Sequence, residues 1–246
     1  MSEAFLALIV FAAFGTEAAM GFGCNVLAVT MAVHLFPLEL LLPVLVSLNL
    51  VVSTYIVLRH RDGIDLRLLL TRILPLMLVG MPMGMLLFNQ GSSSHLKLGF
   101  GVFVVLVAGV ELVRLRRNPL QEAPPLPLWK AALVLALGGL MHGLYASGGP
   151  MAVYYSSRAL PDKHRFRSTL SLLWLLLNAV LMAGYLWRDV MGRRTVELAG
   201  LMVLPLTAGI AGGEWLHSRV NPTTFRLLVF LLLLAGGGVL VLSTVR

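Results

Sequence analysis

The sequence predicts an all-α polytopic membrane protein. Of its 246 residues, 58% are hydrophobic and only 12% are charged, and the mean hydropathy is +0.89. A water-soluble domain has about 25% charged residues, so this chain lacks the polar side chains that would cover a water-exposed surface. Its apolar residues lie in long runs, and a helix needs about 20 of them to cross the hydrocarbon core. We therefore expect the lipid bilayer to be its surroundings.

Eight apolar segments follow one another along the chain, in two sets of four. The expected segments are 4–35, 38–58, 67–88 and 95–115, followed by 129–158, 166–187, 195–217 and 223–243. Residues 116–128 are charged and rich in proline, and they are the only stretch that resembles a linker. The chain is therefore expected to consist of a first membrane repeat (1–115), a linker (116–128) and a second membrane repeat (129–246).

The first segment of each set is interrupted by a glycine-rich break, at residues 15–25 and 138–150. A shift of 124 residues places Gly15 on Gly139 and Phe36 on Leu160, so the breaks occupy corresponding positions. Interrupted hydrophobic segments at matching places in two halves point to the binding site of a transporter. Unwound backbone at membrane depth must be buried in protein or line a water-filled cavity.

The correspondence continues in the third segment of each set. Gly80-x3-Gly84 matches Gly209-x3-Gly213, and Pro75 matches a proline at 205. Glycines spaced in this way let helix backbones approach closely in lipid, so we expect them to serve packing. The prolines are expected to kink their helices.

The breaks leave two topologies open. If each broken segment crosses the membrane once, 12 of the 19 Lys and Arg residues face the cytoplasm and the halves are parallel. If each broken segment is a re-entrant hairpin, 14 of the 19 face the cytoplasm and the halves are inverted. The positive-inside rule favours the second arrangement, an inverted repeat.

The half-helices that follow the breaks suggest the sign of the substrate charge. They are expected to begin near Asn25 and Pro150, with glycines and Ser147 providing open turns at positive φ. A helix N-terminus presents N–H groups and a partial positive charge, which favour an anion. Two asparagines in apolar helices could complete the site. The expected substrate-binding residues are Gly21, Gly23, Asn25, Asn49, Ser147, Gly148, Gly149 and Asn178.

Each break also carries one ionisable residue. Under the 124-residue shift Glu17 falls on Met141, one residue before His142. An ionisable group at membrane depth is costly and faces a cavity or a partner. If the breaks meet, Glu17 and His142 are candidates for coupling transport to a proton or a cation; the alternative is that each merely caps nearby backbone groups.

Several classes of function are excluded or disfavoured. The net charge is +8, but the basic residues lie between apolar runs, as in loops near anionic lipid, and no segment is polar enough to bind nucleic acid. The sequence contains no nucleotide-binding motif, so it predicts a secondary transporter. It indicates no cofactor and no metal site, and its single cysteine, Cys24, cannot form an intramolecular disulfide. A membrane scaffold would not need buried ionisable groups.

The second break resembles a known family signature. Residues 143–150 (Gly-Leu-Tyr-Ala-Ser-Gly-Gly-Pro), then residues 159–161 (Ala-Leu-Pro), a basic stretch and a helix bearing Asn178 are similar to the TauE/SafE family of sulfite and organosulfonate exporters. The resemblance implies an inner-membrane permease that exports small anions, such as sulfur oxyanions, organosulfonates or carboxylates. The first half departs from the pattern, because residues 21–25 (Gly-Phe-Gly-Cys-Asn) replace the usual glycine run. A homodimer is one assembly compatible with this sequence.

An intramembrane hydrolase is the alternative function. Ser147 among glycines could act as a nucleophile, with His217 on a later helix as its base. Glycines also serve unwound helices, so this pattern alone has low specificity.

Overall fold

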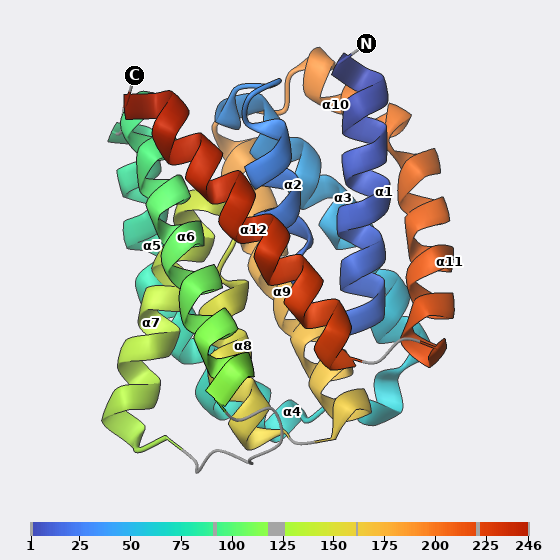
Figure 1. The fold of residues 1–246 in the computed structure, drawn as a ribbon, viewed down its shortest axis with the longest axis vertical. Helices are drawn as coiled ribbons and strands as arrows, with labels where there is room; N and C mark the ends of the chain where they lie inside the picture. The colour runs from blue at the N-terminus through green and yellow to red at the C-terminus, as the bar shows by residue number, and fades with distance from the viewer. Residues whose placement is uncertain (1, 91–92, 118–125, 161, 220–221, 246) are drawn as a thin grey trace.

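The computed structural model describes the whole chain except residues 1, 91–92, 118–125, 161, 220–221 and 246, and the described part is helical (Figure 1). Two short connecting helices, η1 (Arg61–Gly63) and α4 (Leu66–Leu68), and one π-helical turn, η2 (Leu69–Ile73), lie between α3 and α5. The remaining helices are α1 (Ser2–Met20), α2 (Cys24–Ala32), α3 (Leu38–Arg59), α5 (Leu74–Gln90), α6 (Ser93–Arg117), α7 (Leu128–Tyr145), α8 (Gly149–Ala159), α9 (Lys163–Trp187), α10 (Arg193–Leu201), α11 (Val203–Arg219) and α12 (Pro222–Val245).

The helices have the length and composition of membrane spans. Within the described residues, six helices are long and apolar enough to cross a bilayer, or seven if the bent pair α10–α11 counts as one span. Large apolar side chains such as Leu58, Val79 and Leu204 are more than 70% exposed, whereas Glu17 and Asn49 are buried. Apolar residues outside and polar residues inside are the pattern expected of a protein surrounded by lipid.

The two broken segments fold back on themselves. In Figure 1, α1 runs away from the N-terminus, and α2 returns toward the same end. Contacts agree with this direction, because Val26 of α2 lies near Leu233 of α12 and Thr30 lies near Gly236, so α2 follows α12 toward the C-terminus. In the second segment, α8 returns toward the end where α6 finishes, and Tyr154 lies under the guanidinium of Arg114.

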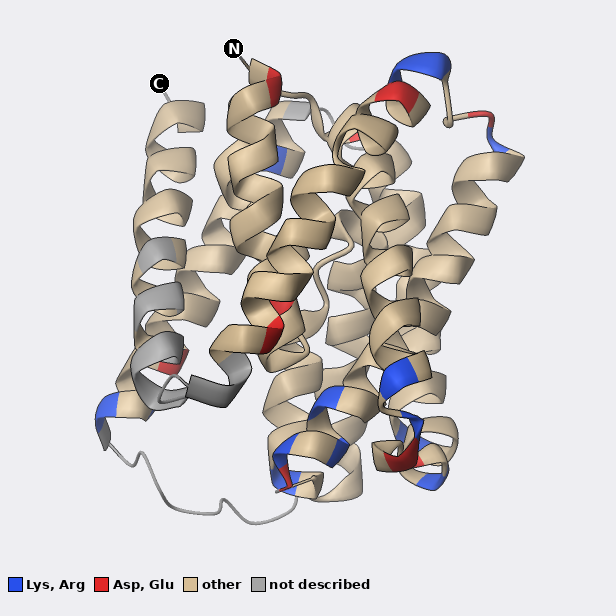
Figure 2. Cartoon of the chain, turned by 90° about the vertical axis from the view of Figure 1, so that its right-hand side faces the viewer, with Lys and Arg blue, Asp and Glu red and all other residues tan. Residues whose placement is uncertain are grey.

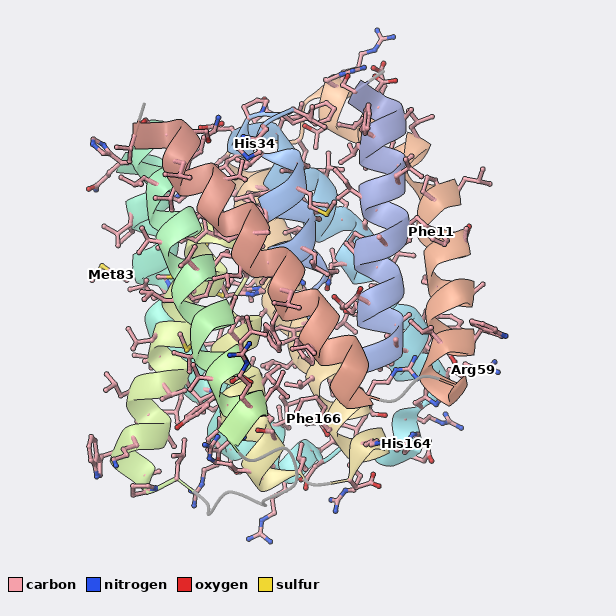
Figure 3. The ribbon with its side chains drawn as sticks, viewed as in Figure 1. Phe11, His34, Arg59, Met83, His164 and Phe166 are labelled. Atoms are coloured by element: carbon pink, nitrogen blue, oxygen red, sulfur yellow. The ribbon has the colours of Figure 1, made fainter. Side chains whose placement is uncertain are left out.

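Both chain termini lie at one end of the bundle, and most basic residues lie at the other end (Figures 1 and 2). Figure 3 shows Arg59 and His164 at this basic end and His34 at the opposite end. We use the term basic end for the side of the bundle where helices α3, α6 and α11 finish and where helices α7, α9 and α12 begin. The positive-inside rule predicts that this end faces the cytoplasm.

Most long helices pack against a helix from the other half of the chain. α1 lies along α11, α5 along α7, α3 along α9 and α6 along α12. Glycines allow the first two pairs to approach closely, as the sequence predicted. A Cβ at Gly213 would lie 2.2 Å from the carbonyl oxygen of Gly15, and one at Gly84 would lie 2.1 Å from that of Leu140. The two halves are therefore intertwined rather than side by side.

The two predicted proline sites coincide with irregular helix geometry. The π-helical turn Leu69–Ile73 ends just before Pro75, and the 40° bend between α10 and α11 lies just before Pro205. Proline removes a backbone donor and crowds the preceding turn, so the helix is disturbed on its N-terminal side. Segments 67–88 and 195–217 are thus found, but each begins with a distorted stretch. Most of the expected linker, 116–128, lies outside the described residues.

Candidate functional site

The two breaks meet at one buried cavity. The space not filled by atoms in the cavity and at its mouth is about 270 Å³. The six polar side chains among its lining that the sequence selected are each at most 5% exposed, so these groups are shielded from solvent. The lining residues are Glu17, Gly23, Cys24, Asn25, Val26, Asn49, His142, Ala146, Ser147, Gly149, Trp174 and Asn178. Eight of the ten residues predicted to bind substrate or couple an ion belong to this lining; Gly21 and Gly148 do not.

Glu17 is held at the end of α1 by groups from two other helices. The amide Nδ2 of Asn49 on α3 donates to both carboxylate oxygens, at 2.9 and 3.0 Å. The carboxylate also accepts the backbone N–H of Cys24, the first residue of α2. Glu17 therefore occupies the N-terminus of α2, where a negative charge is stabilised by unpaired N–H groups and the helix dipole.

A chain of amides continues from Glu17 to the second half. Oδ1 of Asn49 accepts a hydrogen bond from Nδ2 of Asn178 on α9, at 2.7 Å, and another from the Ser53 hydroxyl, at 3.0 Å. Oδ1 of Asn178 has no hydrogen-bond partner. The two asparagines, selected because each lies in an apolar helix, thus join the halves directly at the cavity.

His142, near the end of α7, lies in the cavity wall with both ring nitrogens unpartnered. Its ring stacks on Trp174 of α9, with centroids 5.8 Å apart and an interplanar angle of 18°. The Trp174 indole N–H in turn donates to the carbonyl of Gly21, at 2.9 Å. Packing alone therefore orients the imidazole, and its two polar atoms are left for a group that occupies the cavity.

The two breaks are also bonded to each other. The Asn25 side-chain amide donates to the backbone carbonyl of Ala146, at 2.8 Å. Asn25 does not cap its own helix, because the N-cap of α2 is Gly23, which makes no side-chain cap bond. A buried carbonyl left unwound at the end of α7 needs a donor, and Asn25 provides it from the other half.

The glycines of the site have different roles. Gly21 and Gly23 have φ values of 82° and 101°, a conformation that favours glycine. The expectation of positive φ was wrong for the second break. Gly148 has φ −71°, and the left-handed residue there is Ala146, with φ 50°. Gly148 is instead needed for space, because a Cβ would lie 2.4 Å from the carbonyl oxygen of Gly138, whereas a Cβ at Gly149 would meet no atom within 4 Å.

The sequence did not assign three of these residues to the site. These residues are Cys24, Ser53 and Trp174. Cys24 receives a contact from Asn49 Nδ2 at 3.0 Å, and Ser53 binds Asn49 rather than its own backbone. Ser53 lies four residues after Asn49 on the same helical face, and this spacing was the available signal.

A second polar cluster lies between the cavity and the basic end. Arg167 on α9 lies close to Gly21, where an added Cβ would be 2.9 Å from the Arg167 Cα, and it forms an ion pair with Glu214 on α11. His60, after the end of α3, places Nε2 3.8 Å from Glu214 Oε1, and its ring contacts the ring of His164. Burial, followed by the charge of Arg167, lowers the pKa of His60 below its ordinary value of 6.5.

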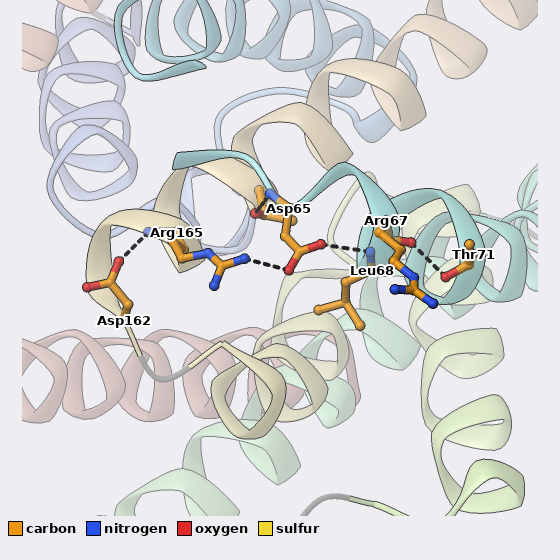
Figure 4. A network of polar contacts seen from close by, with 7 residues as sticks. Asp65, Arg67, Leu68, Thr71, Asp162 and Arg165 are labelled. Atoms are coloured by element: carbon orange, nitrogen blue, oxygen red, sulfur yellow. Dashed lines mark hydrogen bonds and ion pairs between the residues drawn. The ribbon is translucent and has the colours of Figure 1, made fainter. Parts of the chain in front are cut away.

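Further ion pairs connect the two halves at the basic end, as Figure 4 shows. Arg165, at the start of α9, donates to Asp65 Oδ2 at 2.8 Å, while Asp65 Oδ1 caps the N–H of Leu68. The N–H of Asp65 donates to Thr169 Oγ1, at 2.9 Å. These bonds fasten the connection between α3 and α5 to α9 below the cavity.

The arrangement offers little for metal or hydrolytic chemistry. In the part of the chain that the structure describes, no three His, Cys, Asp or Glu residues are grouped so as to hold a metal ion. The Ser147 hydroxyl donates to the Tyr145 carbonyl at 2.8 Å, so it caps the end of α7. The side chain of His217, the proposed base, lies outside the described residues.

Comparison with known proteins identifies the family. The family model described as "Sulfite exporter TauE/SafE" matches residues 6–240. The chain is also similar to a protein of Comamonas testosteroni described as "Probable inner membrane transporter protein TsaS". The two are 25% identical over 166 residues, which cover 67% of this chain and 68% of that protein. No solved structure matches the chain. Because the family match covers nearly the whole sequence, it favours transport over the alternative of a hydrolase. This chain belongs to the TauE/SafE sulfite exporter family and is a multi-pass membrane transporter.

Proposed function

We propose that this protein is a secondary transporter that exports a small anion, a sulfur oxyanion or an organosulfonate, across the inner membrane. The observation that carries the proposal is the meeting of two broken helices at one cavity lined by buried polar side chains. A helix N-terminus from each half reaches this cavity, and such termini favour anions. The family description and the name of the Comamonas relative agree with this class of substrate and this membrane.

We infer that the halves are inverted structural repeats. The order of elements supports this, because a broken hairpin, a long helix, a distorted helix and a final long helix occur twice. The chain directions also support it: α1 starts at the end that carries both termini, whereas its counterpart α7 starts at the basic end (Figure 1). Inverted repeats provide two related conformations, one open to each side, and are a common basis of alternating access.

The moving units are proposed to be pairs of helices from both halves. Rocking of each four-segment half as one rigid body does not fit the intertwined packing of the two halves. The glycine contacts between α1 and α11 and between α5 and α7 are too close to slide easily, so each pair would move together. The asparagine bridge and the ion pairs at the basic end would then break and form as access alternates.

Glu17 and His142 are proposed to couple transport to a proton. Both are about 1% exposed, and both line the cavity without a cationic partner among its lining residues. A buried carboxylate that accepts amide bonds is stabilised while charged, and loss of those bonds during opening would favour its protonation. The binding of substrate and the binding of a proton would thereby depend on each other.

Transport by purified protein in liposomes tests the proposal. Vesicles loaded with sulfite, thiosulfate or methanesulfonate should release these sulfur anions only when the protein is present, and an imposed proton gradient should change the rate. Empty liposomes and liposomes containing Asn49→Leu protein are the controls. If no member of a broad anion panel crosses the bilayer or shifts the thermal unfolding of the protein, the proposed function is wrong.

A further inference from the structure

The two half-helix N-termini at the cavity are not equivalent. The N-terminus of α2 already holds an anion that belongs to the protein, because the Glu17 carboxylate accepts the Cys24 N–H and both bonds from Asn49. The position that corresponds to Glu17 in the second half is Met141, which has no charge to offer. The N-terminus of α8 therefore lacks the built-in carboxylate that fills its counterpart.

Unused polar atoms gather on the α8 side of the cavity. Nδ1 and Nε2 of His142 and Oδ1 of Asn178 make no hydrogen bond of good geometry, although both residues are about 99% buried and their side chains lie within reach of each other. An unpaired buried polar group costs about 1–3 kcal/mol, so such groups mark a place where a ligand or water completes the bonding. All three atoms belong to residues that line the same cavity as Gly149, the first residue of α8.

The backbone also leaves room at this point. A Cβ at Gly149 would meet no atom within 4 Å, whereas one at Gly148 would collide with the Gly138 carbonyl and with His142. Gly149 is thus the glycine of the second break whose missing side chain leaves open space beside the cavity. An anion placed there could approach the first N–H groups of α8, which have no acceptor within the helix.

On the basis of the proposed function, we propose that the transported anion binds on the α8 side, between the Gly149 end of that helix and the His142 ring. The Glu17 carboxylate is then a fixed anion of the protein itself, and it occupies the N-terminus of α2. The substrate class follows from this asymmetry. One vacant helix terminus and one imidazole suit a small monovalent oxyanion, and the Glu17 carboxylate in the same cavity disfavours a second negative charge by Coulomb repulsion.

Binding of two sulfonates to the purified full-length protein tests this assignment. Methanesulfonate carries one charge, which stays constant from mildly acidic to neutral pH, and sulfoacetate carries two. The variants are His142→Gln, Gly149→Ala and Glu17→Gln. Gly109→Ala is the matched control, because a Cβ at Gly109 also meets no atom within 4 Å and that residue does not line the cavity. Thermal unfolding of each variant without ligand shows whether it is folded.

His142→Gln and Gly149→Ala are expected to weaken methanesulfonate binding at least about tenfold, equal to roughly 1.4 kcal/mol, while Gly109→Ala binds it as the wild type does. Glu17→Gln is expected to strengthen sulfoacetate binding more than methanesulfonate binding. The assignment would be overturned if folded His142→Gln and Gly149→Ala both bound methanesulfonate with wild-type affinity. It would also be overturned if Glu17→Gln changed the affinity for the two sulfonates equally. Failure of the wild type to bind either sulfonate would instead contradict the proposed function.

Discussion

Asn178 donates its side-chain amide to Oδ1 of Asn49 at 2.7 Å, and Asn49 donates its own amide to the Glu17 carboxylate. The two asparagines lie on α3 and α9, which come from different halves of the chain and pack against each other. Buried hydrogen bonds through Asn49 therefore connect the carboxylate of the first break to the helix that stacks Trp174 on His142 in the second break. Substitution of either asparagine should therefore alter the structure of both breaks.

Replacing Asn178 should impair transport far more than stability. Hydrogen bonds between membrane helices contribute about 0.6 kcal/mol on average and roughly 1.7 kcal/mol at most, so Asn178→Ala should unfold only slightly more easily. The anion flux into liposomes should fall at least about tenfold, because the connection between the breaks is lost. Ser171→Ala is the control on the same helix, since that buried hydroxyl donates to the Arg167 carbonyl of its own helix backbone, at 2.9 Å. Equal flux in the two variants would contradict the role of the amide bridge.

The topology has a direct test at the chain termini. Both termini lie at the end opposite the basic residues, so reporters fused to either terminus should be found outside the cytoplasm (Figure 2). The parallel arrangement with single crossings would place both termini in the cytoplasm. A reporter active only in the cytoplasm and one active only outside it, fused in turn to each terminus, distinguish the two. Cytoplasmic termini would show that the breaks span the membrane.

Close helix contacts should make some glycines irreplaceable. A Cβ at Gly139 would lie 1.8 Å from the Met77 carbonyl oxygen, in the contact between α5 and α7. Gly139→Ala must push the helices apart and should lower the unfolding free energy by about 1–3 kcal/mol or more. Gly238→Ala, in α12 with no atom within 4 Å of its Cβ, should leave the unfolding temperature in detergent unchanged. Equal unfolding temperatures for the two variants would argue against the packing described.

The single cysteine offers a reporter of cavity opening. Cys24 lines the closed cavity and is about 1% exposed, so a polar maleimide should label it slowly in wild-type protein. Asp65→Asn weakens the bond from Arg165 that fastens the basic end, where both side chains are partly exposed. Such a pair contributes at most about 1 kcal/mol, so the variant should stay folded and label faster from the basic side.

The Arg194–Glu3 pair at the opposite end provides the matched control. Glu3→Gln should not speed labelling from the basic side. If neither variant changes the rate from either side, these ion pairs do not hold the cavity closed.

Stability should respond to acid through His60. Burial lowers the pKa of His60 most, and the positive charge of Arg167 lowers it further. Glu214 opposes this effect, whereas His164 and Arg59 add to it. As the pH falls through 6.5 toward this lowered value, the unfolded chain binds a proton at His60 that the folded chain does not yet bind. His60 therefore costs stability on the acid side of this window, and His60→Gln should flatten the decline in unfolding temperature. His34→Gln, at the opposite end (Figure 3), is the control, and an unchanged slope in His60→Gln would contradict this assignment.

Much of the site could be predicted from the sequence. Glycine-rich interruptions of apolar runs are local features, and so are ionisable or amide residues inside those runs. They led to Glu17, Asn25, Asn49, His142, Ser147 and Asn178, all of which line one cavity. The family resemblance, which rested on the second break, is confirmed by a match over residues 6–240. The roles of individual glycines could not be predicted, because φ and available space depend on distant neighbours.

The sequence by itself determined a membrane-embedded helical protein, the positions of its two breaks and the uneven distribution of its basic residues. These depend on composition and on the length of apolar runs, which the bilayer selects directly. Only the tertiary structure decided that the breaks re-enter, that Asn49 bonds Asn178, and that Glu17 fills one helix terminus while His142 is left unpaired beside the other. Hydropathy is the same for a helix that crosses and one that turns back, and hydrogen bonds between residues more than 100 positions apart exist only after the helices have packed.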